Sequence, residues 1–313
     1  MSAQELNERV RAEFRHEALI YEDADEFLAG TVPFLRVGLE AGEPALVAVS
    51  EVPRALLEEE LGGEAAEVRF ADMEALGRNP ARIIPFWRQF VEECAGRPGR
   101  GIGEPVWPGR EHYESDECQR HEALLNVAFG GQPAWTLLCP YDGSALDHEV
   151  LDRIADSHQH VFGKGLAEEA AGYLDQIDCF AGEFPGRPPV MEEFAFAGDG
   201  LAQVRRRVEH AAELVGMHRE RQADLVLAAS ELAANSVAHG GGTGTFRVWR
   251  DGERLIVEVE DKGLIEEPLV GRIRPNQTQL SGRGLWLANQ LCDLVQIRSG
   301  IHGTTTRLHV ALA

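Results

Sequence analysis

Apolar positions in the first half of the chain fall in short runs separated by longer amphipathic stretches. Short apolar runs are typical of buried strands, and an apolar period near 3.6 residues is typical of helices that pack on one face. The runs predict strands at Glu17–Tyr21, Ala45–Ser50, Glu67–Ala71, Gly101–Val106 and Ala134–Cys139. The amphipathic stretches predict helices at Ala24–Glu40, Pro53–Leu61, Pro80–Ala95, Ser115–Phe129, Asp147–Phe162 and Gly165–Asp178. This alternation indicates an α/β domain with a doubly wound, mostly parallel sheet.

The second half has a different order of elements. Asp251-Gly252 stands between two apolar runs, which is a strong hairpin signal. The pattern predicts strands at Glu192–Phe196, Phe246–Trp249, Leu255–Val259, Val295–Arg298 and Thr304–Leu312. It predicts helices at Leu201–Leu214, from His218 to the glycines at Gly240–Gly242, and at Ser281–Leu294.

The helix that ends at Gly240 carries the first candidate chemistry. Glu231 and Asn235 lie one turn apart on one face of it. A carboxylate there can accept a proton, and an amide oxygen can ligate a hard cation such as Mg²⁺. An ordinary amphipathic helix with two solvated polar residues is the alternative. The helical wheel puts Ala228, Ala238 and His239 on the same face and predicts a buried opposite face of Val226, Ala229, Ala233 and Val237.

Two further motifs follow this helix in order. Asp261-Lys262-Gly263 comes directly after a predicted strand, and Ser281-Gly282-Arg283-Gly284 opens a predicted helix. A glycine-rich turn at a helix start presents backbone N–H groups to an anion, so Gly282 and Gly284 are suited to binding phosphate.

The order of these motifs resembles the GHKL ATPase superfamily, and specifically its anti-sigma-factor serine kinase branch. The matching features are Glu-x-x-x-Asn on a helix, Asp-x-Gly after a strand, Gly-x-Gly-Leu at a helix start and Gly-Thr before the last strand. The resemblance covers the chain from about Met191 onward and implies an α+β sandwich of the Bergerat type that binds ATP and Mg²⁺.

The resemblance also implies roles for individual residues. Asn235 would ligate the Mg²⁺ that bridges the phosphates, and Glu231 would be the catalytic carboxylate. Asp261 would accept a hydrogen bond from the adenine amino group, with Gly263 allowing the ring to approach. An acceptor-only carboxylate suits this role, because it distinguishes an exocyclic amine from a carbonyl oxygen.

The remaining implied contacts surround the phosphates and the far end of the adenine. Gly282, Arg283 and Gly284 would line the phosphates, and Thr304 would support the adenine end. The irregular stretch Glu266–Gln279 occupies the position of the superfamily's ATP lid.

Length and composition agree with two globular domains. The chain has 313 residues, of which 44% are hydrophobic and 26% charged. The formal net charge of −22 argues against nucleic-acid binding, because nucleic-acid binders present a basic surface. No apolar run is long enough to span a bilayer, so we expect a cytoplasmic protein without membrane contact. The predicted divisions are a flexible N-terminus at 1–13, a first domain at 14–165, a linker at 166–190 and a second domain at 191–313.

The first domain resembles the MEDS sensory domain, which is similar to a RecA-type sheet without its phosphate loop. The matching stretches are Phe14–Glu17, His121–Asn126 and Cys139–Asp142. The resemblance implies a sensor of small molecules or of partner signals, with a small-molecule ligand at this domain. Parallel sheets bind ligands at the carboxyl ends of their strands.

Histidines and cysteines do not suggest a metal site by their spacing. His148, His158 and His160 have no i, i+4 pair on the predicted helix and are assigned surface or capping roles. His16 stands at a strand entrance, which makes a phosphoacceptor role unlikely. Reduced thiols are expected for Cys94, Cys118, Cys139, Cys179 and Cys292, which show no Cys-x-x-Cys spacing.

Three functions fit the sequence. The leading hypothesis is an ATP-dependent serine/threonine kinase and anti-sigma factor, which binds a sigma factor and phosphorylates a STAS-type antagonist under control of the sensory domain. The second is a sensor histidine kinase, whose helical pair with a phosphoacceptor histidine is missing between Phe162 and Met191. The third is a non-catalytic, nucleotide-gated interaction module. Small kinases of the anti-sigma branch commonly dimerise, so a homodimer is one expected assembly.

Overall fold

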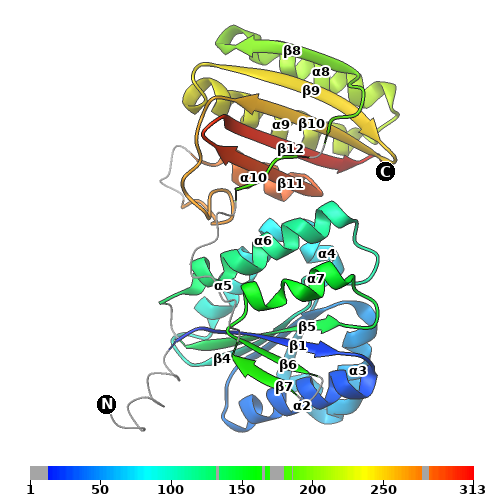
Figure 1. Ribbon diagram of the computed structural model, residues 1–313, viewed down its shortest axis with the longest axis vertical. Coiled ribbons are helices and arrows are strands. Elements are labelled where there is room, and N and C mark those ends of the chain that lie inside the picture. Colours follow the sequence, from blue (N-terminus) through cyan, green and yellow to red (C-terminus); the bar gives the residue numbers. More distant parts are fainter. Residues whose placement is uncertain (1–12, 132–133, 164–165, 170–179, 185, 277–281) are drawn as a thin grey trace. The chain divides into compact units, whose positions relative to one another are not determined.

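The two halves of the chain form separate units in the computed structural model, at Met1–Ile177 and Asp178–Ala313 (Figure 1). The residues that the structure describes are 13–131, 134–163, 166–169, 180–184, 186–276 and 282–313. The predicted flexible N-terminus therefore lies, except for its last residue, outside the described residues.

A seven-stranded sheet is the centre of the first unit, with the strand order β3-β2-β4-β5-β1-β6-β7. All neighbouring strands are parallel except β6 and β7, which are antiparallel. This confirms the predicted mostly parallel sheet. The strands are β1 Arg15–Tyr21, β2 Ala45–Val49, β3 Val68–Asp72, β4 Gly99–Gly103, β5 Trp135–Asp142, β6 His160–Gly163 and β7 Leu166–Glu169.

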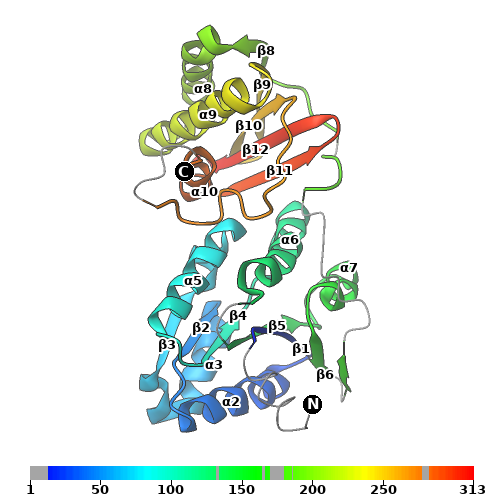
Figure 2. The same ribbon diagram turned by 90° about the vertical axis from the view of Figure 1, so that its left-hand side faces the viewer.

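Helices cover both faces of this sheet, with α2 on one side and α5 and α6 on the other (Figure 2). The α2 side buries Phe27 and Leu35 against strand residues such as Val47 and Ile102. The α5 side is aromatic, and the ring centroids of Trp87 and Trp135 lie 5.5 Å apart. The helices are α2 Ala24–Glu40, α3 Glu51–Leu61, α4 Met73–Gly77, α5 Ile83–Glu93, α6 His112–Phe129 and α7 His148–Asp152.

The predicted helix at Asp147–Phe162 is wrong. Helix α7 ends at Asp152, a 3₁₀ turn covers Ile154–Asp156, and His160 begins β6, which pairs in parallel with β1. Gly163 has φ of 128°, and an added Cβ would collide with the carbonyl oxygen of Ile20. Tertiary pairing at this sheet edge therefore overrides the helical pattern.

The predicted helix at Gly165–Asp178 is also wrong where it is described. Leu166–Glu169 forms β7, which pairs with β6, and 170–178 lie outside the described residues.

His158 does not have the predicted surface or capping role on a helix. It lies between the 3₁₀ turn and β6 and is fully buried. Its neighbours are His16, Glu122 and Cys139, which are buried as well. The four cysteines that the structure describes, Cys94, Cys118, Cys139 and Cys292, are buried and form no disulfide. Cys179 lies outside the described residues.

The second unit has a five-stranded antiparallel sheet in the order β11-β12-β10-β9-β8, with its helices on one face (Figure 2). The predicted hairpin of β9 and β10 is present, with Asp251 as the last residue of β9 and Gly252 and Glu253 as the turn. The turn between Gly300 and Gly303 joins β11 and β12. The strands are β8 Glu192–Ala197, β9 Thr243–Asp251, β10 Arg254–Asp261, β11 Leu294–Gly300 and β12 Gly303–Ala311. The helices are α8 Leu201–Leu214, α9 Arg219–His239 and α10 Gly284–Leu291.

Helix α9 packs on the sheet through a different stripe from the predicted one. Ala228 was predicted on the polar face but is fully buried, whereas Val226 and Val237 are only half-buried. The buried positions follow an i, i+3, i+4, i+7 pattern and are Leu225, Ala228, Ala229, Leu232, Ala233 and Ser236. Glu231 and Asn235 therefore border the buried stripe instead of facing away from it.

We predict that acid weakens the second unit through His309 of β12. Burial, together with the charges of Arg254 and Arg307, lowers the pKa of His309 to about 3, whereas Asp293 acts in the other direction. Between the ordinary pKa of 6.5 and about 3 the unfolded chain binds a proton that the folded chain does not, so stability falls as the pH falls through this window. We expect this residue to contribute a slope of up to about 1.4 kcal/mol per pH unit.

Urea unfolding of the full chain at several pH values in this window checks this. The variant His309→Leu should have a shallower dependence of stability on pH, even if its stability at neutral pH is lower. The exposed His302 in the turn between β11 and β12 provides the control, and His302→Leu should keep the slope of the parent. Equal slopes for the parent and His309→Leu would contradict the prediction.

Candidate functional site

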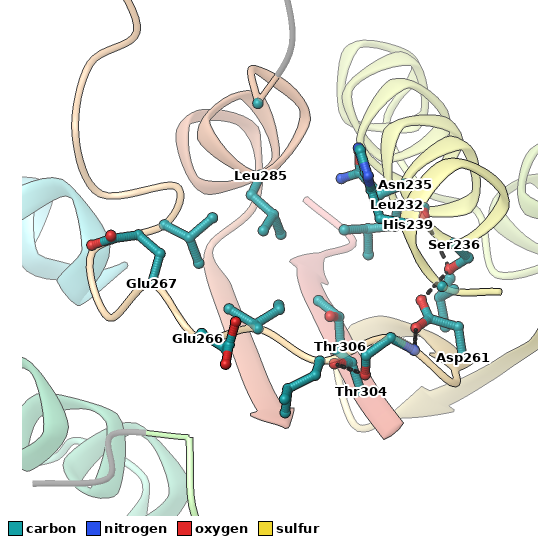
Figure 3. A pocket seen from close by; sticks show the side chains of 17 residues that line it. Leu232, Asn235, Ser236, His239, Asp261, Glu266, Glu267, Leu285, Thr304 and Thr306 are labelled. Atoms are coloured by element: carbon teal, nitrogen blue, oxygen red, sulfur yellow. Dashed lines mark hydrogen bonds between the residues drawn. The ribbon is translucent and has the colours of Figure 1, made fainter. Parts of the chain in front are cut away.

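A pocket of about 410 Å³ opens in the second unit between α9, α10, the end of β10 and the chain that follows it (Figure 3). Its apolar wall includes Leu232 and Leu285, and Asn235 and His239 reach it from α9. The remaining lining residues are Ser236, Gly240, Val259, Asp261, Gly263, Leu264, Ile265, Glu266, Glu267, Val270, Gly282, Thr304 and Thr306. Its volume lies within the range of about 300–1,000 Å³ that is usual for small-molecule sites.

The Asp261 carboxylate is held in one orientation at the edge of this pocket. Its Oδ2 accepts a hydrogen bond of 2.5 Å from Ser236 Oγ, and its Oδ1 accepts one of 2.8 Å from the backbone N–H of Gly263 (Figure 3). Gly240 packs against the carboxylate so closely that an added Cβ would collide with it. Each carboxylate oxygen has about two lone-pair sites, so both can accept a further hydrogen bond from a ligand.

A chain of hydrogen bonds extends from Gly263 to the last two strands. Thr304 Oγ1 donates to the carbonyl oxygen of Gly263 over 2.9 Å and lies 2.6 Å from Ser299 Oγ. Ser299 Oγ in turn accepts from the backbone N–H of Ile265 over 2.9 Å. Thr304 therefore fixes the backbone that follows Asp261, and it is a buried residue of the pocket wall.

Helix α10 approaches α9 where Glu231 and Asn235 lie. A Cβ added to Gly284 would stand 2.9 Å from Glu231 Oε2 and 3.1 Å from Asn235 Nδ2. Only glycine allows this spacing without displacement of either side chain. Asn235 lines the pocket, whereas Glu231 lies outside it and borders a groove between α8 and α9.

The segment after β10 closes one side of the pocket with Glu266, Glu267 and Val270. Asn289 of α10, which is buried, donates from Nδ2 to the carbonyl oxygen of Gly271 over 2.9 Å and so anchors this segment. The end of the predicted lid, at 277–279, lies outside the described residues.

The structure brings most of the predicted site residues together. Those that line the pocket are Asn235, Asp261, Gly263, Gly282 and Thr304. Gly284 contacts Asn235, and Arg283 is the N-cap residue of α10, exposed beside Gly282.

Sequence reasoning missed Ser236, Ser299 and Asn289. A polar residue in the buried stripe of a helix requires a partner, and this rule could have identified Ser236. The partners of Ser299 and Asn289 are set by contacts distant in the sequence, for which no local signal exists.

The carboxyl ends of the parallel strands in the first unit also gather polar groups. Ser50 donates to Glu104 Oε2 from its backbone N–H over 2.8 Å and from Oγ over 2.7 Å. Burial raises the pKa of Glu104, although the two hydrogen bonds from Ser50 act in the opposite direction. Burial, Glu104 and Asp142 raise the pKa of Tyr21 as well.

Within the part of the chain that the structure describes, we find no helix with the length and hydropathy of a membrane span.

Comparison with known families gives two matches. Residues 15–159 match the family model described as MEDS, the methanogen/methylotroph, DcmR sensory domain. Residues 194–310 match the model of the histidine kinase-like ATPase domain. No curated protein matches the chain.

One matching solved structure is that of the RsbU and RsbW domains of Rv1364c from Mycobacterium tuberculosis. It is 22% identical with a TM-score of 0.30, and the match covers 39% of this chain and 33% of that one. The chain thus spans about a third of the length of that protein.

The family matches confirm the resemblances found in the sequence motifs and agree with the observed parallel and antiparallel sheets. The chain therefore combines an N-terminal MEDS domain with a C-terminal histidine kinase-like ATPase domain.

Proposed function

We propose that this protein is an anti-sigma regulatory kinase, which binds Mg²⁺-ATP in the pocket of the second unit and phosphorylates a serine or threonine of an antagonist protein. The observation that carries the proposal is the Asp261 carboxylate, held by Ser236 and Gly263 at the edge of a pocket in an ATPase-family domain. A fixed carboxylate with free lone pairs is a specific acceptor for the exocyclic amine of adenine.

Asn235 would hold the Mg²⁺ of the nucleotide. Among the residues that the structure describes, those that line the pocket include Asp261, Glu266 and Glu267 but neither lysine nor arginine. A triphosphate placed among these carboxylates requires positive charge, which a divalent cation supplies. The Asn235 amide oxygen is a suitable ligand, and the backbone at Gly282 and Gly284, at the start of α10, would contact the phosphates.

Glu231 would act on the attacking hydroxyl group. In the proposed transfer, the substrate oxygen forms a bond to the γ-phosphorus, the bond from this phosphorus to ADP breaks, and Glu231 receives the hydroxyl proton. Positioning and charge neutralisation provide most of the acceleration in reactions of this class. Glu231 borders the groove between α8 and α9, which offers a route by which a protein hydroxyl could reach it.

The proposed partners are a sigma factor and a STAS-type antagonist, with the MEDS domain controlling the kinase through a small-molecule ligand or a partner signal. We propose a cytoplasmic protein that can form a homodimer, with domains at 14–165 and 191–313 and a connection at 166–190, of which Leu166–Glu169 adds β7 to the first sheet. A sensor histidine kinase and a nucleotide-gated interaction module are the competing functions.

We predict that two substitutions on α9 separate binding from transfer. Asn235→Ala removes the proposed Mg²⁺ ligand and should abolish Mg²⁺-dependent ATP binding. Glu231→Ala should bind Mg²⁺-ATP within about twofold of the parent but reduce phosphoryl transfer at least about 100-fold, because general base catalysis contributes roughly 10²–10⁴-fold. Isothermal titration and transfer of γ-labelled phosphate measure the two effects.

Gln203 and Glu213 of α8 provide matched controls, since neither lines the pocket. Gln203→Ala and Glu213→Ala should leave binding and transfer unchanged. Parental binding of Mg²⁺-ATP by Asn235→Ala would refute the proposed nucleotide site.

We predict that Asp261→Asn weakens ATP binding by about 10- to 150-fold. The expected loss corresponds to one charge-assisted hydrogen bond, about 1.5–3 kcal/mol. The affinity ratio of ATP to GTP should fall as well, because the asparagine amide can donate to the guanine carbonyl oxygen. An unchanged ratio in competition titrations would show that Asp261 does not contact the base.

The stability of the phosphorylated product distinguishes the three functions. Purified protein is incubated with Mg²⁺ and γ-labelled ATP, with and without candidate antagonist proteins. Acid-stable label on a serine or threonine of the antagonist, absent with Glu231→Ala, supports the proposed kinase. Acid-labile label on the protein itself supports a histidine kinase, and binding without transfer supports the interaction module.

A further inference from the structure

Four buried side chains of different elements in the first unit converge on one point. His16 of β1, Glu122 of α6, Cys139 of β5 and His158 before β6 each direct one potential metal ligand there. These ligand atoms all lie within 4.8 Å of one another. We propose that they form a four-coordinate site for a divalent transition metal of the Zn²⁺ class.

The distances agree with a tetrahedral site. His16 Nε2 lies 3.2 Å and His158 Nε2 3.1 Å from Glu122 Oε2, and Cys139 Sγ lies 3.4 Å from His16 Nε2. Ligands placed about 2.0–2.3 Å from a zinc ion at tetrahedral angles are separated from each other by roughly 3.3–3.8 Å. Binding therefore requires shifts of a few tenths of an ångström for the closest pairs.

The second nitrogen of each imidazole is held by a backbone carbonyl. His158 Nδ1 lies 2.8 Å from the carbonyl oxygen of Ile154, and His16 Nδ1 lies 3.1 Å from that of Ser157. In neutral rings these contacts put the proton on Nδ1 and leave a lone pair on Nε2. The same arrangement orients metal-bound histidines in proteins in general.

The two lone pairs then face a carboxylate, which is unfavourable without a cation between them. Glu122 Oε1 and His158 Nε2 are both buried without a hydrogen-bond partner. Buried polar groups in this state are rare, and a metal ion would give His158 Nε2 a partner.

The ligand types favour zinc over magnesium or calcium. Two imidazole nitrogens, one sulfur and one carboxylate oxygen suit a borderline-soft ion, whereas hard ions select oxygen ligands. A thiol ligates a metal ion as the thiolate, so metal binding would release the proton of Cys139.

The site would join stretches that are distant in the sequence. Each of the three stretches that resemble the MEDS family contributes one ligand, and His158 adds the segment that leads into β6. A metal ion would thereby attach β6 to the centre of the sheet. Loss of the ion would release this edge, which is a route by which the metal state of the domain could act as a signal.

Cobalt binding by the full chain tests the site, because Co²⁺ reports its geometry and ligands by absorption. Protein stripped with a chelator should bind one equivalent of Co²⁺ with the intense visible bands of tetrahedral coordination and a thiolate-to-cobalt charge-transfer band. Zn²⁺ should displace it and raise the Tm by at least about 5 °C. Co²⁺ at the nucleotide pocket would be octahedral and lack the thiolate band.

Variants and one further measurement make the test decisive. Cys139→Ser should lose the charge-transfer band and His158→Gln should weaken Co²⁺ affinity at least about tenfold, whereas the buried control Cys94→Ser should behave as the parent. X-ray absorption of the unsubstituted Zn²⁺ protein should find one sulfur and three nitrogen or oxygen neighbours, which keeps the test valid if a variant fails to fold. No stoichiometric binding, a zinc shell without sulfur or an unchanged band in Cys139→Ser would overturn the proposal.

Discussion

The close approach of α9 to the end of β10 is the constraint on which the nucleotide pocket depends. Alanines at 228, 229 and 233 allow the helix to lie against the sheet, and Gly240 allows it to end beside Asp261. Ser236 is then close enough to donate to the carboxylate. Larger residues in this stripe would move the helix outward and break the hydrogen bond that holds the half-buried carboxylate of Asp261.

The same requirement for small residues recurs on the other side of the pocket. Gly284 allows the start of α10 to contact Glu231 and Asn235, so the predicted catalytic and metal-binding side chains border the glycine turn that would contact phosphate. The bond from Asn289 to Gly271 anchors the segment that closes one side of the pocket. The site is thus built on packed helices and strands, with an anchored segment at one side.

In the first unit, the carboxylate of Glu122 is buried among two histidines and a thiol. Burial of a charge is unfavourable unless partners compensate it, and the groups that surround Glu122 come from β1, β5 and the segment before β6. Tyr141 contributes a further hydrogen bond of 3.1 Å to Glu122 Oε2. Because these partners are distant in sequence, the polar centre forms only when the whole sheet is assembled.

The sequence by itself determined the elements whose pattern is local. Helices α2 and α8 have the predicted bounds, because their apolar period and flanking residues are sufficient to define them. The order of the motifs also identified both families, since each motif is a short stretch with its own chemistry.

Tertiary structure decided what depends on distant partners. His160–Gly163 is a strand because β1 offers an edge, the buried stripe of α9 is set by the sheet beneath it, and Ser236 has its role because Asp261 is adjacent. The cluster around Glu122 has no sequence signal, because its four residues come from four separate segments. Local patterns encode which groups are available, and only long-range packing decides which of them meet.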